Sequence, residues 1–200
     1  MPRGRAPTDA QRFELVAIAA SAGGLSALMA VLAHLPPTFS RPLAIVQHID
    51  PTHESLLVEI LGRRTLLPVR QAEDTDVMTP GQVYVAPPGT HFEVMEGLRI
   101  ALTRSKPLHF VRPSADRLFQ SAAATCSPLI AVVLTGSGYD GADGVLAVKA
   151  SGGFVIVQDP RTSAFAGMPQ AALNTGVVDR VLPLIEIAPA LIDLVGVEAA

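Results

Sequence analysis

The chain alternates short runs that are apolar at almost every position with longer segments in which apolar residues recur at helical spacing. In the first half this pattern predicts strands at 15–19, at 43–47 and around 69, with helices at 25–33 and 54–61. Strands that are apolar throughout and rich in Val, Ile and Ala are typical of parallel sheets buried on both faces. Strand and helix in succession therefore predict a parallel sheet with right-handed crossovers.

The middle of the chain changes character. Short strands predicted at 83–86, 92–95 and 99–102 are separated by Pro87-Pro88-Gly89 and Glu96-Gly97, a pattern typical of an antiparallel hairpin insertion. Ser114 is a predicted N-cap for the helix that follows. The second half returns to the earlier alternation, and its predicted elements are helices at 114–125, 141–150, 169–173 and 184–195 and strands at 130–134, 154–157 and 178–181.

Length and composition indicate one domain with a substantial core. The sequence has 200 residues, of which 49% are hydrophobic and only 4% aromatic, so the core must be aliphatic. Residues 1–13 are polar and lack periodicity, which predicts a disordered tail or the stub of a linker. The folded domain is therefore expected at 14–197.

Charge and cysteine content exclude several classes of protein. The formal net charge is −3 and the basic residues are scattered, so we expect no nucleic-acid partner. Cys126 is the sole cysteine, which excludes an intrachain disulfide and a cysteine-based metal site and fits a reducing cytoplasm. The apolar stretch 15–35 is interrupted by Ser21 and Gly23-Gly24, which favours a strand, a turn and a helix over a signal peptide or membrane anchor.

Three polar motifs each follow a predicted strand. They place Ser21, His48 and Asp140 just beyond strands that end at 19, 47 and 134. In an open parallel sheet, ligands bind outside the carboxyl ends of the strands, so these side chains are expected to meet at one edge. Serine, histidine and aspartate together are the residues of a hydrolase triad, in which a base activates the serine and an acid orients the base.

Each of the three residues also has a plainer interpretation. Ser21 has only small neighbours, as a nucleophile on a sharp strand-to-helix turn requires, but it could instead cap the helix or form part of a phosphate-binding turn. His48 could be a solvated residue at a strand end, and Asp140 could cap a helix. Among the rival residues, we expect His34 and His109 to be structural and Asp143, inside a predicted helix, to face solvent. His53 beside Glu54 lacks a clear third ligand, so no metal site is expected.

The motifs together resemble the catalytic domain of the chemotaxis protein-glutamate methylesterases, the CheB family. The resemblance runs from about Leu15 to Val195 and is carried by Ala20-Ser21-Ala22-Gly23-Gly24, Val46-Gln47-His48, Pro80 to Pro87, Arg112-Pro113-Ser114, Leu134-Thr135-Gly136 with Asp140-Gly141-Ala142, Gln158-Asp159 and Gly167-Met168-Pro169. It implies a three-layer α/β/α domain with a mostly parallel, doubly wound sheet of about seven strands and an antiparallel hairpin insertion.

The resemblance also implies a function. Ser21, His48 and Asp140 would hydrolyse γ-glutamyl methyl esters on the cytoplasmic domains of methylated chemoreceptors, without cofactor or metal, and could also deamidate receptor glutamines. Backbone N–H groups at Ala22 and Ser137 are the candidates for an oxyanion hole. The candidate residues of the substrate cleft are Arg112, Gln158 and Met168, each of which could equally be a structural contact.

Two departures from the family pattern bear on regulation and substrate. Many members carry a receiver domain ahead of the catalytic domain, whereas a short polar tail precedes it here, so control by phosphorylation within the chain is not expected. Ser137 replaces a common methionine, and the segment 50–57 replaces a proline-rich turn, as in the branch fused to a methyltransferase. A methyltransferase or a separate response regulator are therefore further candidate partners. The alternative functions are a receptor-docking module without significant turnover and an esterase of a signalling system outside chemotaxis.

Overall fold

A computed structural model of the chain describes residues 13–49 and 55–196. Its elements in chain order are β1 (Val16–Ala20), α1 (Gly24–Leu32), β2 (Leu43–Gln47), α2 (Leu57–Gly62), β3 (Val69–Gln71), β4 (Val83–Val85), β5 (His91–Met95), the 3-10 turn η2 (Glu96–Leu98), β6 (Arg99–Thr103), α3 (Ala115–Thr125), β7 (Ile130–Val133), α4 (Ala142–Ala150), β8 (Phe154–Gln158), the 3-10 turn η3 (Pro160–Thr162), α5 (Gly167–Asn174), β9 (Arg180–Leu182) and α6 (Leu184–Val195).

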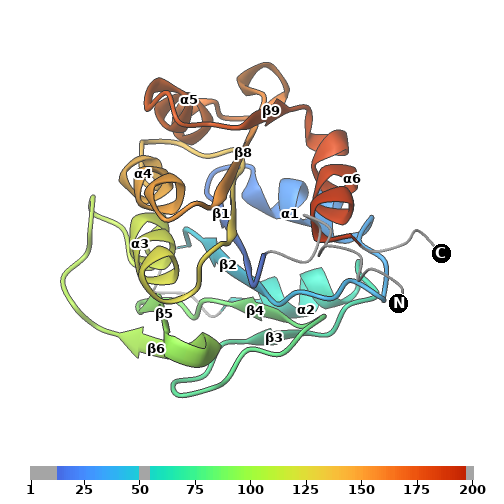
Figure 1. The fold of residues 1–200 in the computed structure, drawn as a ribbon, viewed down its shortest axis with the longest axis vertical. Coiled ribbons are helices and arrows are strands. Elements are labelled where there is room, and N and C mark those ends of the chain that lie inside the picture. Colours follow the sequence, from blue (N-terminus) through green and yellow to red (C-terminus); the bar gives the residue numbers. More distant parts are fainter. Residues whose placement is uncertain (1–12, 50–54, 197–200) are drawn as a thin grey trace, which may run out of the picture.

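Seven strands form one parallel sheet in the order β3-β4-β2-β1-β7-β8-β9. Helices cover both of its faces, with α1 and α6 on one side and α3, α4 and α5 on the other (Figure 1). Side chains of β1 alternate between the two cores: Val16 and Ile18 pack beneath α1 and α6, whereas Ala17 and Ala19 face the core under α3 and α4. This alternation explains why the buried strands are apolar at every position.

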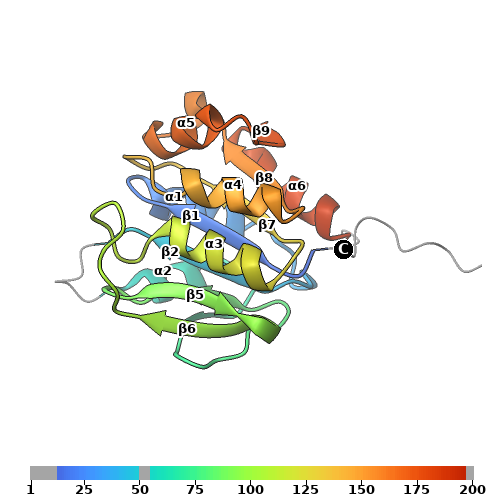
Figure 2. The same cartoon turned by 60° about the vertical axis from the view of Figure 1, so that its left-hand side comes forward.

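Strands β5 and β6 form a separate antiparallel ribbon that lies beside α3 (Figure 2). Side chains of α3 hold its near strand, because the Val94 N–H donates to Ser121 Oγ at 3.0 Å and Thr125 Oγ1 donates to the Val94 carbonyl at 2.9 Å. The hairpin insertion predicted from the sequence is therefore present. It is a two-stranded sheet of its own and adds no strand to the main sheet.

Most sequence predictions of elements are confirmed, with two corrections. The predicted strand at 83–86 does not belong to the hairpin, because β4 pairs in parallel with both β2 and β3. The last strand, β9, spans 180–182 and not the predicted 178–181. Asp179 lies before the strand, and its side-chain carboxylate accepts a hydrogen bond from the Val155 N–H of β8. Ser114 is the N-cap of α3, as predicted, and accepts from the Arg117 N–H.

The stretch 15–35 consists of β1, a turn and α1, as predicted, and no helix in the described segments has the length and apolar character to cross a bilayer. The predicted tail at 1–13 lies almost wholly outside the described residues and stays a prediction. His53 and Glu54 also fall outside them. The helix predicted at 54–61 starts later than predicted, because residues 55 and 56 are described and are not helical and α2 begins at Leu57.

The order of the strands fixes where a site can form. The chain passes from β1 to β2, which pairs with one edge of β1, and β7 later pairs with the opposite edge of β1. Beyond the carboxyl ends of strands at such a reversal, the connecting loops part and leave a crevice. Strands β2, β1 and β7 are the three that precede His48, Ser21 and the loop carrying Asp140.

Candidate active site

The backbone brings Ser21 and His48 side by side. Ala20 and Gln47 are register partners at the ends of β1 and β2, and the His48 N–H donates to the Ala20 carbonyl at 3.0 Å. Beyond Ser21 the chain turns sharply, because the Gly24 N–H returns to the Ser21 carbonyl at 2.8 Å and α1 begins at Gly24. The small residues around Ser21 permit this turn, which leaves the serine partly exposed.

Asp140 is buried next to His48 and is held in place by hydrogen bonds to both of its carboxylate oxygens. Its Oδ2 accepts from His48 Nε2 at 2.8 Å and from the Ala115 N–H at 2.6 Å. Its Oδ1 accepts from Ser114 Oγ at 2.8 Å and from the Asp116 N–H at 3.2 Å. Burial by itself would raise the pKa of Asp140, but these hydrogen bonds and the attraction to His48 outweigh it and hold the pKa below its ordinary value.

The contact between His48 and Asp140 decides which ring nitrogen can act as a base. A carboxylate only accepts hydrogen bonds, so Nε2 of His48 carries the proton that faces Asp140. Nδ1 is then the unprotonated nitrogen, whose lone pair can accept a proton. Within the described residues Ser21 Oγ makes no hydrogen bond, as is common for a catalytic pair in the absence of substrate. Ser21 is partly exposed, so its hydroxyl is accessible.

The side chain of Gln47 ties the serine and histidine loops together. It is only 7% exposed, and its Nε2 donates to the Ser21 carbonyl at 2.8 Å and to the His48 carbonyl at 2.9 Å. Residue 24 must be glycine beside it, because a Cβ there would lie 2.1 Å from Gln47 Oε1. The amide therefore fixes the distance between the two loops through their backbones.

Two backbone donors beside Ser21 are unused. Neither the Ala22 N–H nor the Ser137 N–H has an acceptor within the part of the chain that the structure describes. Gly136, directly before Ser137, packs so tightly that a Cβ on it would lie 2.8 Å from the Cβ of Ser21. Free N–H groups on both sides of a serine, with the start of α1 behind them, are suited to binding a developing oxyanion.

Comparison with known proteins agrees with this arrangement. The model of the CheB methylesterase family matches residues 16–191. The chain belongs to this family. A solved structure, the CheB methylesterase catalytic domain of Thermotoga maritima, is 36% identical and superposes with a TM-score of 0.87, covering 91% of this chain and 98% of that one.

Two curated relatives differ in how much of them the CheB domain occupies. A protein-glutamate methylesterase/protein-glutamine glutaminase of Anaeromyxobacter dehalogenans is 44% identical over 96% of this chain and 56% of its own length. A putative protein of the same name from Leptospira interrogans is 37% identical over 91% of this chain and 95% of its own length. The chain thus spans about half the length of the first relative.

The predicted cleft residues divide into one that lines a cavity and two that do not. Arg112 lines a cavity together with His48, Gly89 and Phe110, and its Nη1 donates to the carbonyls of residues 104 and 105. Arg112 therefore also holds the loop that forms the wall of this cavity. Its position beside His48 agrees with a role in the CheB cleft.

Gln158 and Met168 fit the structural alternative, because neither is among the residues that line the cavity beside His48. Both side chains are 1% exposed. Gln158 uses its whole amide internally, because Oε1 accepts from the Thr135 N–H at 2.9 Å and Nε2 donates to the Thr162 carbonyl at 3.1 Å. Met168 lies behind Gly136, where a Cβ would come within 2.2 Å of its sulfur. Both side chains therefore contact the loop of Thr135 and Gly136 from inside the domain.

Sequence analysis missed three groups that build the site. Gln47 was seen only as part of a motif, Ser114 only as a helix cap, and the Ala115 and Asp116 N–H groups at the start of α3 not at all. The available signal for Gln47 was a polar residue at the end of a strand that is otherwise fully buried, where its amide must find partners. Nothing in the sequence indicates that the first turn of α3 holds Asp140.

Proposed function

We propose that this chain is a protein-glutamate methylesterase in which Ser21 is the nucleophile, His48 the general base and Asp140 the residue that orients the imidazole. The substrate would be the γ-methyl ester of glutamate side chains on the cytoplasmic domains of chemoreceptors. One observation carries the proposal: His48 Nε2 lies 2.8 Å from an Asp140 carboxylate that three further donors hold in place. That bond leaves Nδ1 of His48 free for the neighbouring serine.

In the first step Ser21 Oγ adds to the ester carbonyl while its proton passes to Nδ1 of His48. The N–H groups of Ala22 and Ser137 stabilise the negative oxygen of the tetrahedral intermediate. When the intermediate collapses, methoxide leaves and takes the proton from Nδ1, so methanol is released and an acyl-serine remains. Water then attacks the acyl group with His48 as base, which yields the glutamate carboxylate and restores the serine hydroxyl.

The decisive experiment measures methanol released from methylated receptor fragments by the unaltered chain and by Ser21→Ala. Because triad residues act as a unit, we expect turnover to fall on the order of 10⁴-fold or more. Ser26→Ala is the matched control, since Ser26 is an exposed serine on α1, five residues away. Its turnover should equal that of the unaltered chain.

Binding to the same fragments separates the alternatives. Tight receptor binding without methanol release by the unaltered chain would identify a docking module. Release that persists in Ser21→Ala would remove the serine mechanism. Release from small methyl esters but not from receptor fragments would point to a signalling esterase outside chemotaxis.

The names of the relatives favour a second activity of the same site, because they pair the methylesterase with a protein-glutamine glutaminase. A glutamine side chain presents the same carbonyl with ammonia in place of methanol as the leaving group. We propose that the chain also deamidates receptor glutamines through the acyl-Ser21 intermediate. Ammonia release from fragments that carry glutamine, abolished by Ser21→Ala, tests this activity.

A further inference from the structure

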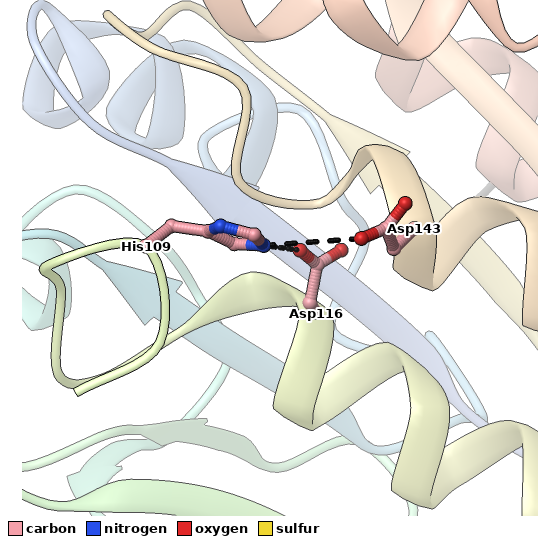
Figure 3. Close-up of side chains that lie close together, drawn as sticks. All are labelled: His109, Asp116 and Asp143. Atoms are coloured by element: carbon pink, nitrogen blue, oxygen red, sulfur yellow. Dashed lines mark ion pairs between the residues drawn. The ribbon is translucent and has the colours of Figure 1, made fainter. Parts of the chain in front are cut away.

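Three side chains that the triad does not use converge between the start of α3, the start of α4 and the loop that precedes α3. His109 Nε2 lies 3.1 Å from Asp116 Oδ2 and 3.9 Å from Asp143 Oδ2, and the three point toward one another (Figure 3). The ring of His109 also makes an edge contact with Tyr139, at 4.7 Å between ring centroids. His109 was expected to be structural and Asp143 solvent-facing; Asp143 does lie in a helix and is exposed.

Asp116 is a buried carboxylate with one oxygen short of a donor. Its side chain is 1% exposed, and Oδ1 accepts from the Gly144 N–H at 2.6 Å. Within the described segments Oδ2 accepts no hydrogen bond, because the nearby ring nitrogen of His109 is close but not aligned to donate. A buried carboxylate oxygen that lacks a donor is costly. This oxygen points into the space between the three side chains (Figure 3).

The negative charge around that oxygen exceeds the positive charge. The Asp116 N–H binds Asp140, and Asp143 stands on the far side, so three carboxylates lie within one neighbourhood. Among the described residues, the side chains that contact these carboxylates and could carry positive charge are the imidazoles of His48 and His109, and His48 is already bonded to Asp140. A bound cation would balance the remaining charge.

The donor atoms suit a transition metal better than magnesium or calcium. One imidazole nitrogen and two carboxylate oxygens lie within 4.8 Å of one another. Ligands of one zinc ion, at about 2.0–2.2 Å from the metal, lie about 3–3.5 Å apart. His109 and Asp116 already have this separation, and the exposed Asp143 carboxylate, 3.9 Å from His109 Nε2, would have to move inward. Imidazole is a preferred ligand of zinc and its neighbours, whereas magnesium and calcium favour oxygen alone.

We propose that His109, Asp116 and Asp143 bind a divalent transition-metal ion such as Zn²⁺, with water completing the coordination. The ion fastens the loop of His109 to α3 and α4. Residues 110–113 of that loop line the cavity beside His48, so the ion stabilises one wall of that cavity. The proposal concerns metal binding alone and stands whether or not the chain is an esterase.

The test is a titration of the chelator-treated full chain with Zn²⁺, followed by calorimetry, and with Mg²⁺ for comparison. We expect one Zn²⁺ site that His109→Ala and Asp143→Asn each weaken at least tenfold, and no comparable binding of Mg²⁺. His34→Ala is the matched control, because His34 is an exposed imidazole on another part of the surface, whose Nδ1 hydrogen-bonds to the carbonyl of residue 30. Its Zn²⁺ affinity should equal that of the unaltered chain.

A second measurement identifies the ligands directly. Co²⁺ in place of Zn²⁺ should give a visible absorption band that is lost in His109→Ala, and saturating Zn²⁺ should raise the unfolding temperature of the unaltered chain but not of that variant. Zn²⁺ binding of equal strength in His109→Ala and Asp143→Asn would overturn the proposal. So would the absence of a site in the unaltered chain at micromolar Zn²⁺, which would leave the cluster as an ion pair only.

Discussion

Replacing Gln47 by leucine tests whether one buried amide sets the geometry of the proposed triad. The change removes Nε2, which donates to the carbonyls of both Ser21 and His48, and keeps an apolar side chain of similar size in the core. Ser21 and His48 themselves are untouched. A loss of activity would therefore come from their positions and not from their chemistry.

The magnitude follows from counting the partners that remain. The Ser21 carbonyl still accepts from the Gly24 N–H, and Gln47 Oε1 has no partner to lose. The His48 carbonyl loses the only hydrogen bond that it accepts within the described residues. This carbonyl is part-buried, so the loss should lower the unfolding free energy by about 1 kcal/mol, at the low end of the about 1–3 kcal/mol that a fully buried unpaired carbonyl costs. A displacement of about 1 Å between nucleophile and base can lower turnover on the order of 10²-fold.

Both quantities can be measured on the same variant. Urea denaturation gives the unfolding free energy, and methanol release from methylated receptor fragments gives the turnover. Gln82→Leu is the matched control, because Gln82 also donates to a backbone carbonyl, that of residue 68 at 2.9 Å, but at the amino end of β4. Its turnover should not change. If Gln47→Leu retained both the stability and the turnover of the unaltered chain, the amide would not position the two loops.

Three further changes give distinct results. Asp140→Asn places an NH2 group among four donors and should lower turnover on the order of 10³-fold or more. Folding lowers the pKa of Asp140, so in denaturation experiments the unaltered chain should lose the stability that the Asp140 carboxylate contributes as pH falls below about 4, whereas the Asn variant should not show this loss. Gly136→Ala puts a Cβ 2.2 Å from Met168 Sδ and 2.8 Å from the Ser21 Cβ, so it should cost about 1–3 kcal/mol in urea denaturation and lower turnover at least tenfold. Burial and repulsion from Asp140 raise the pKa of Asp116 to about 6 on folding, so the unaltered chain should lose stability as pH rises from about 4 to about 6. Asp116→Asn should lack this loss, and denaturation at pH 4.5 and at pH 7 with a chelator measures the difference.

The fold was predictable because hydrophobic patterning and chain order determine most of it. Fully apolar runs separated by helical segments predict a parallel sheet, and β2 and α6 have the predicted bounds. The error at 83–86 arose because three short strands in sequence resemble a meander. Pairing of β4 with β2 and β3 depends on contacts between distant segments, which local spacing does not encode.

The positions of the three triad candidates were predictable from the same strand pattern as the fold. Ser21, His48 and Asp140 follow strands that the pattern identifies, so their meeting at one sheet edge could be inferred without contacts. The cluster of His109, Asp116 and Asp143 could not, because His109 stands in a loop without periodicity. Its backbone adopts a left-handed φ of 52°, a conformation that no sequence pattern around it indicates.

The buried Gln158 and the overlooked Gln47 have one physical explanation. Both follow Ile-Val at the carboxyl end of a buried parallel strand, Gln47 in β2 and Gln158 in β8. Each amide is too far inside to be solvated and must bond to backbone nearby. Gln47 holds the loop after β1, and Gln158 holds the loop after β7 through the Thr135 N–H. A glutamine that ends such a strand thus braces the loop of the adjacent strand. The two glutamines fix the loops that carry Ser21 and Asp140. A polar residue at the carboxyl end of a buried strand can therefore serve to hold a neighbouring loop and need not contact a ligand bound there.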